Sequence, residues 1–229
     1  MKPVNTGLGG AGLRPLLSLL QLASPALPVG GFAYSQGLEK AIEDGIVRDA
    51  ATAQQWIEDM LLLSLARFEA PVWLRAFDAS ATDDAAALTR WNEECLAARE
   101  TAELRAETQQ MGASLLKVFP ALDLEQPPLD PVAYPVAFAC ACACLGIDRE
   151  AGLAAYLWAG IENQVLVAVK SVPLGQQAGQ ALLFRLHPSL SQAVQTATQV
   201  LDDELGSAAV RFTLACARHE TQYSRLYRS

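Results

Sequence analysis

Apolar residues recur at intervals of three and four positions along most of the chain, the spacing that places them on one face of an α-helix. Leu13, Leu16, Leu17 and Leu20 show this spacing near the start and predict a short amphipathic helix over residues 13–23. The alternating β-branched runs that predict strands do not occur in the sequence. The pattern therefore predicts an all-α fold.

Cap and turn residues divide this pattern into segments. Ser35, Asp49 and Asp148 are typical first caps, and the stretch from Thr82 to Asp84 is acidic where a helix dipole favours negative charge. We expect a single globular domain of about ten helices with short Pro/Gly-rich connections. The predicted helices cover residues 13–23, 35–44, 49 to a break at 71, 82–119 with a break near 99–107, 131–146, 148–170, 176–186, 188–203 and a last segment from 206.

Prolines mark three of these boundaries. Pro71 is expected to break or kink the long helix that contains Trp56 and Leu65, because proline lacks an N–H and its ring clashes with the preceding turn. Residues 123–131 form a Pro-rich linker, and Pro131 and Pro188 are expected at the starts of the following helices.

Three regions differ in composition. Residues 1–12 are Gly-rich and are expected to be flexible. Residues 13–206 are expected to form the helical domain. Residues 207–229 form a basic C-terminal segment with Arg211, Arg218, Arg225 and Arg228. Arg and Tyr are favoured at contacts, so this segment is expected to dock either on its own acidic body or on a partner.

The overall composition indicates a folded protein that does not bind polyanions such as nucleic acid. Hydrophobic residues make up 52% and charged residues 18% of the 229 residues, and the formal net charge is −8. A large core is therefore available. Binding to nucleic acid or to an anionic membrane surface is not expected, because both require excess Lys and Arg.

No membrane span and no export framework are expected. The longest uncharged run, residues 132–147, is shorter than the roughly 20 residues of a spanning helix and contains Pro135. Five cysteines form no disulfide framework. The simplest compartment is the reducing cytoplasm.

The stretch SPALPVGGFAYSQGLE, residues 24–39, contains prolines and glycines, whereas most of the chain consists of residues that favour helices. It does not fit a phosphate loop, because the Walker and dinucleotide patterns need other glycine spacings and a preceding strand. One interpretation is a plain turn with Phe32 buried. The other is a surface for a partner, which better explains why Tyr34, Ser35, Gln36 and Glu39 lie so close together.

The cysteine-rich stretch CACAC, residues 140–144, has two interpretations. Cys140 and Cys144 share one helix face and could supply two of the four ligands of a tetrahedral metal site. Cysteine is also a readily buried small residue, and the neighbours here are Ala, Phe and Leu. The core interpretation is favoured, and a metal-binding chaperone is the alternative function.

A catalytic site is not expected. His219 and Glu220 are adjacent and diverge on a helix, and His187 precedes a proline in a predicted loop. No recognised nucleophile motif accompanies them. No cofactor is predicted either.

Three separated stretches carry a family resemblance: LASPALPVGGFAYSQGLE, KSVPLGQQAGQ and ARHETQYSRLYRS. In this order they resemble the urease accessory protein UreF family, and weaker similarity such as CLAARETAELRAETQQMGASLL extends across nearly the whole chain. The resemblance implies an all-α protein without a reaction of its own. It also implies a role as the middle component that links UreD/UreH to the nickel-carrying GTPase UreG, as a homodimer, for nickel insertion into urease apoprotein.

The resemblance also assigns residues. Glu39, Lys170 and His219 resemble the surface that faces the GTPase. Arg225 resembles an arginine that holds the C-terminus against the aromatic position occupied here by Phe32. The remaining residues assigned to docking of the C-terminal segment are Tyr34, Tyr223 and Arg228.

Overall fold

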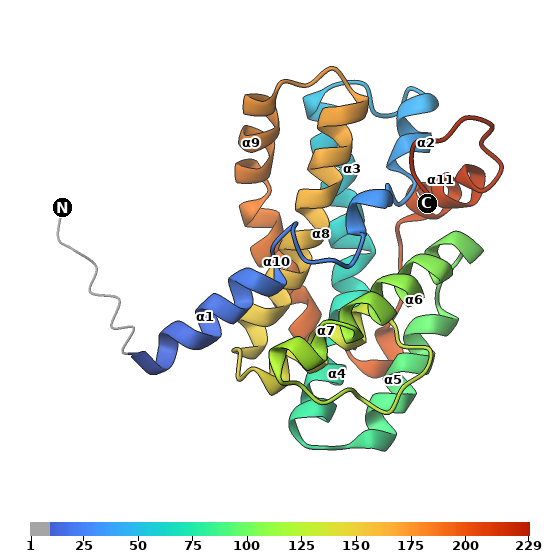
Figure 1. Cartoon of the computed structure of the whole chain (residues 1–229). Helices are drawn as coiled ribbons and strands as arrows, with labels where there is room; N and C mark the ends of the chain where they lie inside the picture. Colours follow the sequence, from blue (N-terminus) through green and yellow to red (C-terminus); the bar gives the residue numbers. More distant parts are fainter. Residues whose placement is uncertain (1–9) are drawn as a thin grey trace.

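The computed structural model describes residues 10–229, and in this range every regular element is helical (Figure 1). The all-α single domain and its approximate number of helices are thereby confirmed. Four short 3₁₀ helices lie between the α-helices: η1 (Gly31–Ala33), η2 (Leu65–Arg67), η3 (Phe119–Leu122) and η4 (Asp202–Glu204). The α-helices are α1 (Gly10–Leu22), α2 (Leu38–Glu43), α3 (Ala50–Leu63), α4 (Glu69–Ala81), α5 (Ala85–Ala97), α6 (Ala102–Leu116), α7 (Tyr134–Cys144), α8 (Arg149–Ser171), α9 (Gln176–Arg185), α10 (His187–Gln199) and α11 (Val210–His219).

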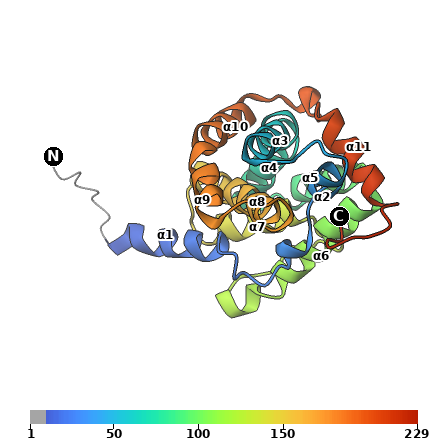
Figure 2. The same ribbon diagram turned by 90° about the horizontal axis from the view of Figure 1, so that it is seen from above.

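The core forms around α4, α7 and α8. Helix α7 is apolar on all sides, and each of its residues from Pro135 to Cys142 is buried, as expected of a helix that other helices surround. It packs against α4, α6 and α8, and Trp73, Phe119 and Phe138 are among the largest fully buried side chains. Seen from above, α9, α10, α11 and α6 lie around α3, α4, α7 and α8 (Figure 2).

Several predicted helix starts are correct. The Asp49 carboxylate accepts a hydrogen bond from the Thr52 N–H at 2.8 Å, and the Asp148 carboxylate accepts one from the Ala151 N–H at 2.9 Å. The start predicted at Thr82–Asp84 is capped by Asp84, the last residue of that stretch. The predicted break near residues 99–107 lies where Thr101 caps α6. Short polar side chains next to an apolar repeat are therefore good guides to helix starts in this chain.

Three boundary predictions are wrong. The N-cap of α2 is Gly37 rather than Ser35, although the Ser35 hydroxyl accepts the Glu39 N–H at 3.4 Å as well as bonding to Ser229. The long helix ends at Leu63, upstream of Pro71, and Pro71 lies in the first turn of α4, where a missing N–H is tolerated. Pro131 precedes α7, and Pro135 occupies the early helical position.

Helix α1 extends away from the other helices (Figures 1 and 2). It agrees with the amphipathic helix predicted over residues 13–23, but Leu13, Leu17 and Leu20 are exposed and only Leu22 is buried. The segment predicted to be flexible, residues 1–12, lies mostly outside the described residues, and the helix starts at Gly10.

Helix α8 is the one described helix that is long and apolar enough, by length and composition alone, to cross a membrane. More than half of its apolar stretch, 56%, is buried inside the protein. It packs against α9, α3, α7 and α10, so the fold accounts for its apolar residues as core.

Candidate functional site

The last ten residues, 220–229, fold back onto residues 24–39. We call residues 220–229 the tail and residues 24–39 the hook. The Arg228 N–H donates to the Ala33 carbonyl at 2.9 Å, and the Ser35 N–H donates to the main-chain oxygen of Ser229 at 2.7 Å. The Ser35 hydroxyl bonds to the same oxygen at 2.5 Å. The hook and the tail therefore form one site, next to α2 and α6 (Figure 1).

Glu39 holds the middle of the tail. Its carboxylate accepts the main-chain N–H of Leu226 at 2.7 Å and that of Tyr227 at 3.2 Å. Glu39 is buried in the first turn of α2. Buried main-chain N–H groups need an acceptor, and a charged acceptor forms a stronger bond than a neutral one. One side chain thus satisfies two tail amides.

His219, at the end of α11, lies between two carboxylates. Its Nε2 is 3.1 Å from Glu39 and its Nδ1 is 2.8 Å from Glu103, and the side chain is fully buried. Each ring nitrogen thus has its own carboxyl partner. The other oxygen of Glu103 pairs with Arg225. A continuous chain of polar contacts therefore connects the tail to α2, α6 and α11.

Glu107 lies under the end of the tail. One of its oxygens accepts from the Gln36 amide at 2.7 Å, and the other bonds to the Ser229 hydroxyl at 2.6 Å. Burial raises the pKa of this carboxyl from its ordinary 4.5 to about 7, although the two hydrogen bonds act in the opposite direction. We call the residues that hold the tail, directly or through one another, the tail seat: Ala33, Ser35, Gln36, Glu39, Glu103, Glu107 and His219.

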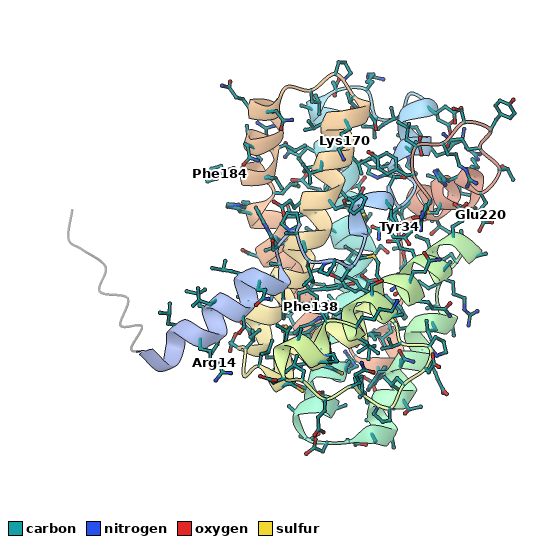
Figure 3. The ribbon with its side chains drawn as sticks, viewed as in Figure 1. Arg14, Tyr34, Phe138, Lys170, Phe184 and Glu220 are labelled. Carbon is teal, nitrogen blue, oxygen red and sulfur yellow. The ribbon has the colours of Figure 1, made fainter. Side chains whose placement is uncertain are left out.

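The hook is itself fixed to the helices below it. The Tyr34 hydroxyl donates to Gln110 of α6 at 2.8 Å. Two amides of α8 donate to hook carbonyls at 3.0 Å, Asn163 to Tyr34 and Gln164 to Ser35. Burial, followed by the charge of Glu107, raises the pKa of Tyr34. Figure 3 shows Tyr34 among these helices. The hook therefore acts as a rigid platform for the tail.

The structure brings Glu39 and His219 together, but not on an open surface. Both were predicted to face a GTPase, and both are covered by the tail. Lys170, the third residue of that prediction, is exposed near the end of α8 (Figure 3). Tyr227 of the tail lies beside Ser171, the next residue along α8. Lys170 therefore lies at the edge of the docked tail, while Glu39 and His219 lie beneath it.

The predicted pairing of Arg225 with Phe32 is wrong. Arg225 pairs with Glu103, and the Phe32 ring is 69% exposed. A carboxylate is a stronger partner for a guanidinium than an aromatic face, and Glu103 also positions His219. Tyr223 projects fully into solvent. Arg228 reaches Gln110 at 3.5 Å, the residue that also accepts from Tyr34.

Sequence reasoning missed the contribution of α6. Glu103, Glu107 and Gln110 are spaced by four and three positions, so they lie on one face of the helix. A polar, acidic helix face in a chain whose last segment is basic is a signal for a charged contact between the two. The contact also needs the hook, whose position depends on the fold.

The cysteines of α7 lie in the core rather than at a site. Cys140 and Cys142 are buried, and Cys144 is exposed at the end of the helix. Burial raises the pKa of Cys140 to about 12, which disfavours the thiolate that a metal requires. Within residues 10–229, no group of three or more His, Cys, Asp or Glu side chains has the geometry to hold a metal ion. This placement favours the core interpretation.

A second cluster of buried charge lies below the hook. Glu69 of α4 pairs with Arg99 and also accepts from the Tyr156 hydroxyl. Arg99 contacts the Cys95 sulfur at 3.4 Å as well. The pair forms part of the wall of a cavity of about 130 Å³, which the hook and α8 close on the other side.

Comparison with known proteins gives a consistent family match. The family model UreF matches residues 47–187. A urease accessory protein UreF of Azoarcus sp. (strain BH72) is 50% identical over 227 residues, which cover 95% of this chain and 97% of the relative. The protein of the same name from Cupriavidus necator is 48% identical, with 95% and 99% covered. That from Janthinobacterium sp. (strain Marseille) is 50% identical, with 94% and 99% covered.

Proposed function

The chain belongs to the UreF family of urease accessory proteins, and we propose that it is a scaffold and regulator of the GTPase UreG. In this role it links UreG to UreD/UreH so that nickel is inserted into urease apoprotein. It acts in the cytoplasm as a homodimer within that complex, and it has no catalytic reaction of its own. The observation that carries the proposal is the similarity to UreF proteins along nearly the full length of the chain.

The docked tail supports a partner-binding role. Its main chain faces inward, toward Glu39 and Ala33, while Tyr223 and Leu226 point into solvent. Exposed aromatic and apolar side chains held by a fixed main chain are suited to contact a second protein. Lys170 extends this surface along α8. We propose that UreG contacts Lys170 and the outer side of the tail.

Glu39 and His219 have a different role in this proposal. Since they are buried beneath the tail, they act on the partner by positioning the tail. Lys170 acts by direct contact. The two classes are separable, because a positioning residue affects the tail in the isolated protein and a contact residue does not.

A three-component binding experiment tests the proposal. The tagged chain is mixed with purified UreD and UreG, and retention of both proteins is expected. Retention of neither protein, in binary and in ternary mixtures, would overturn the scaffold role. The oligomeric state of the complex is measured by light scattering, with two copies of this chain expected.

Matched lysine variants test the contact surface. Lys170→Ala is expected to reduce UreG retention and urease activation while the helical circular dichroism signal is unchanged. Lys117→Ala is the control, because Lys117 is also exposed but follows the last residue of α6. Equal retention of UreG by the two variants would remove Lys170 from the proposed surface.

A further inference from the structure

Glu107 is a buried carboxyl held by neutral groups. It is 5% exposed, and its two hydrogen-bond partners are an amide, that of Gln36, and a hydroxyl, that of Ser229. A carboxylate removed from water is stable when a cation pairs with it. Neither of these partners supplies a positive charge. Both partners donate to the carboxyl oxygens, which favours the ionised form, but removal from water favours the protonated acid and has the larger effect.

Two charged groups on neighbouring elements act on Glu107 in opposite directions, and the cation has the larger effect. Arg99, between α5 and α6, favours ionisation, and Glu69 of α4 opposes it. Tyr34 of the hook and Cys216 of α11 face the carboxyl as neutral side chains. Burial remains the largest influence, and it raises the pKa of Glu107 to about 7.

The tail supplies part of this burial. Ser229 is 2% exposed, and it bonds through its hydroxyl to Glu107 and through its main-chain oxygen to Ser35. Departure of the tail would remove this cover and admit water to the carboxyl. Ionisation of Glu107 is therefore more costly with the tail docked than with the tail released.

We propose that the tail seat is a proton-linked switch centred on Glu107. Protonated Glu107 holds the tail, and ionised Glu107 weakens its docking. The conclusion rests on the buried carboxyl, its two neutral partners and the cover that Ser229 provides. It requires no partner protein.

The direction and range of the effect follow from linkage. The pKa of Glu107 is raised in the docked state, from 4.5 to about 7, so docking is strongest below about pH 4.5. It weakens by up to about tenfold per pH unit as the pH rises from 4.5 to 7, and it is constant above about pH 7. The full range, 7 − 4.5 = 2.5 units, corresponds to roughly 300-fold when the released carboxyl is fully solvated. Acidification therefore favours the docked state of the tail.

Hydrogen exchange of the tail amides measures the switch. The N–H groups of Leu226 and Arg228 bond to Glu39 and Ala33, so they exchange slowly only while the tail is docked. Exchange is measured from pH 5 to 8 on the full chain and divided by that of a free peptide of the tail sequence. Protection is expected to fall by at least tenfold between pH 5 and 7 and to remain level above pH 7. Peptides from α8 show whether global unfolding contributes.

Glu107→Gln separates the contribution of this carboxyl from that of every other group in the tail seat. The amide imitates the protonated acid, so the variant is expected to keep the tail protected and to lose most of the fall below pH 7. An unchanged fall in Glu107→Gln, or a flat wild-type profile, would overturn the proposal.

A direct titration covers the case in which the variant does not fold. The side-chain carboxyl carbon of Glu107 in the wild-type chain is followed by NMR as the pH is changed. A midpoint near 7 is expected, and a midpoint below 5 would contradict the switch.

Discussion

Two clusters of buried charge, one around Arg99 and one around His219, are built differently. Glu69 and Arg99 belong to the helical body and are held together with Tyr156 among packed helices. Glu39, Glu103 and His219 belong to the tail seat, where part of the network belongs to a ten-residue tail. The first cluster can be broken only with the body, whereas the second can open alone. We therefore expect that loss of a charge partner destabilises the whole fold at the first cluster and only the docking of the tail at the second.

The largest expected effect is at the body cluster. Arg99→Met removes the cation and leaves Glu69 buried without its charge partner. Removal of one member of a buried ion pair costs about 3–5 kcal/mol. We expect a loss of this size in the free energy of unfolding, measured in urea.

Arg149→Met is the control for this prediction. Arg149 pairs with Asp78 at 2.7 Å, but both side chains are more than a third exposed. Exposed pairs contribute roughly 0.2–1 kcal/mol. Similar losses in the two variants would show that the body cluster is no more important than a surface pair.

The next effect is at the joint between hook and α11. Gly37 has a φ of +75°, and a Cβ added there would lie 2.9 Å from the main-chain nitrogen of Cys216. Gly37→Ala is expected to cost roughly 1–3 kcal/mol and to displace α11 together with His219. Tail protection in hydrogen exchange should fall by more than that of α8.

Gly45→Ala provides the matched control, because Gly45 has a similar φ of +69° with open space around it. In Gly45→Ala, backbone strain alone is expected to lower the free energy of unfolding by about 1 kcal/mol. If Gly45→Ala releases the tail as much as Gly37→Ala does, the contact with Cys216 has no special role.

An effect of similar size is expected within the tail seat. His219→Gln keeps one polar contact and loses the pair of bonds to Glu39 and Glu103. Hydrogen bonds to charged groups contribute about 1.5–3 kcal/mol, which should increase trypsin cleavage after Arg225 roughly tenfold with little change in global stability. His187→Gln is the control, since His187 is exposed on α10. A large global loss in His219→Gln would show that the seat is part of the body.

The sequence predicted the fold more fully than it predicted the tail seat. Helix starts at Asp49, Asp148 and near Asp84 follow from local chemistry within one turn, and local chemistry is visible in sequence. The family motifs assign Glu39 and His219 to one surface, and in the structure the two side chains are in contact. Their burial was not foreseen, because it depends on a tail 180 or more residues away from the hook.

The choice of partner for Arg225 shows why the remainder was not predictable. Motif matching paired Arg225 with the aromatic position of Phe32, whereas the folded chain places Glu103 nearer. Glu103 lies in a segment with no conspicuous motif. Its importance comes only from the packing of α6 beside α11 and the hook.

The smallest effect distinguishes two ways in which the tail seat could work. Arg225 and Glu103 are 36% and 20% exposed, so Arg225→Ala is expected to weaken tail docking by only about 0.2–1 kcal/mol. Trypsin cannot report on this variant at residue 225, so hydrogen exchange of the Leu226 amide is used. An effect as large as that of His219→Gln would mean that Arg225, Glu103 and His219 act as a unit. An effect several times smaller would place the strength of the seat in the buried contacts of Glu39 and His219, with Arg225 free to meet a partner.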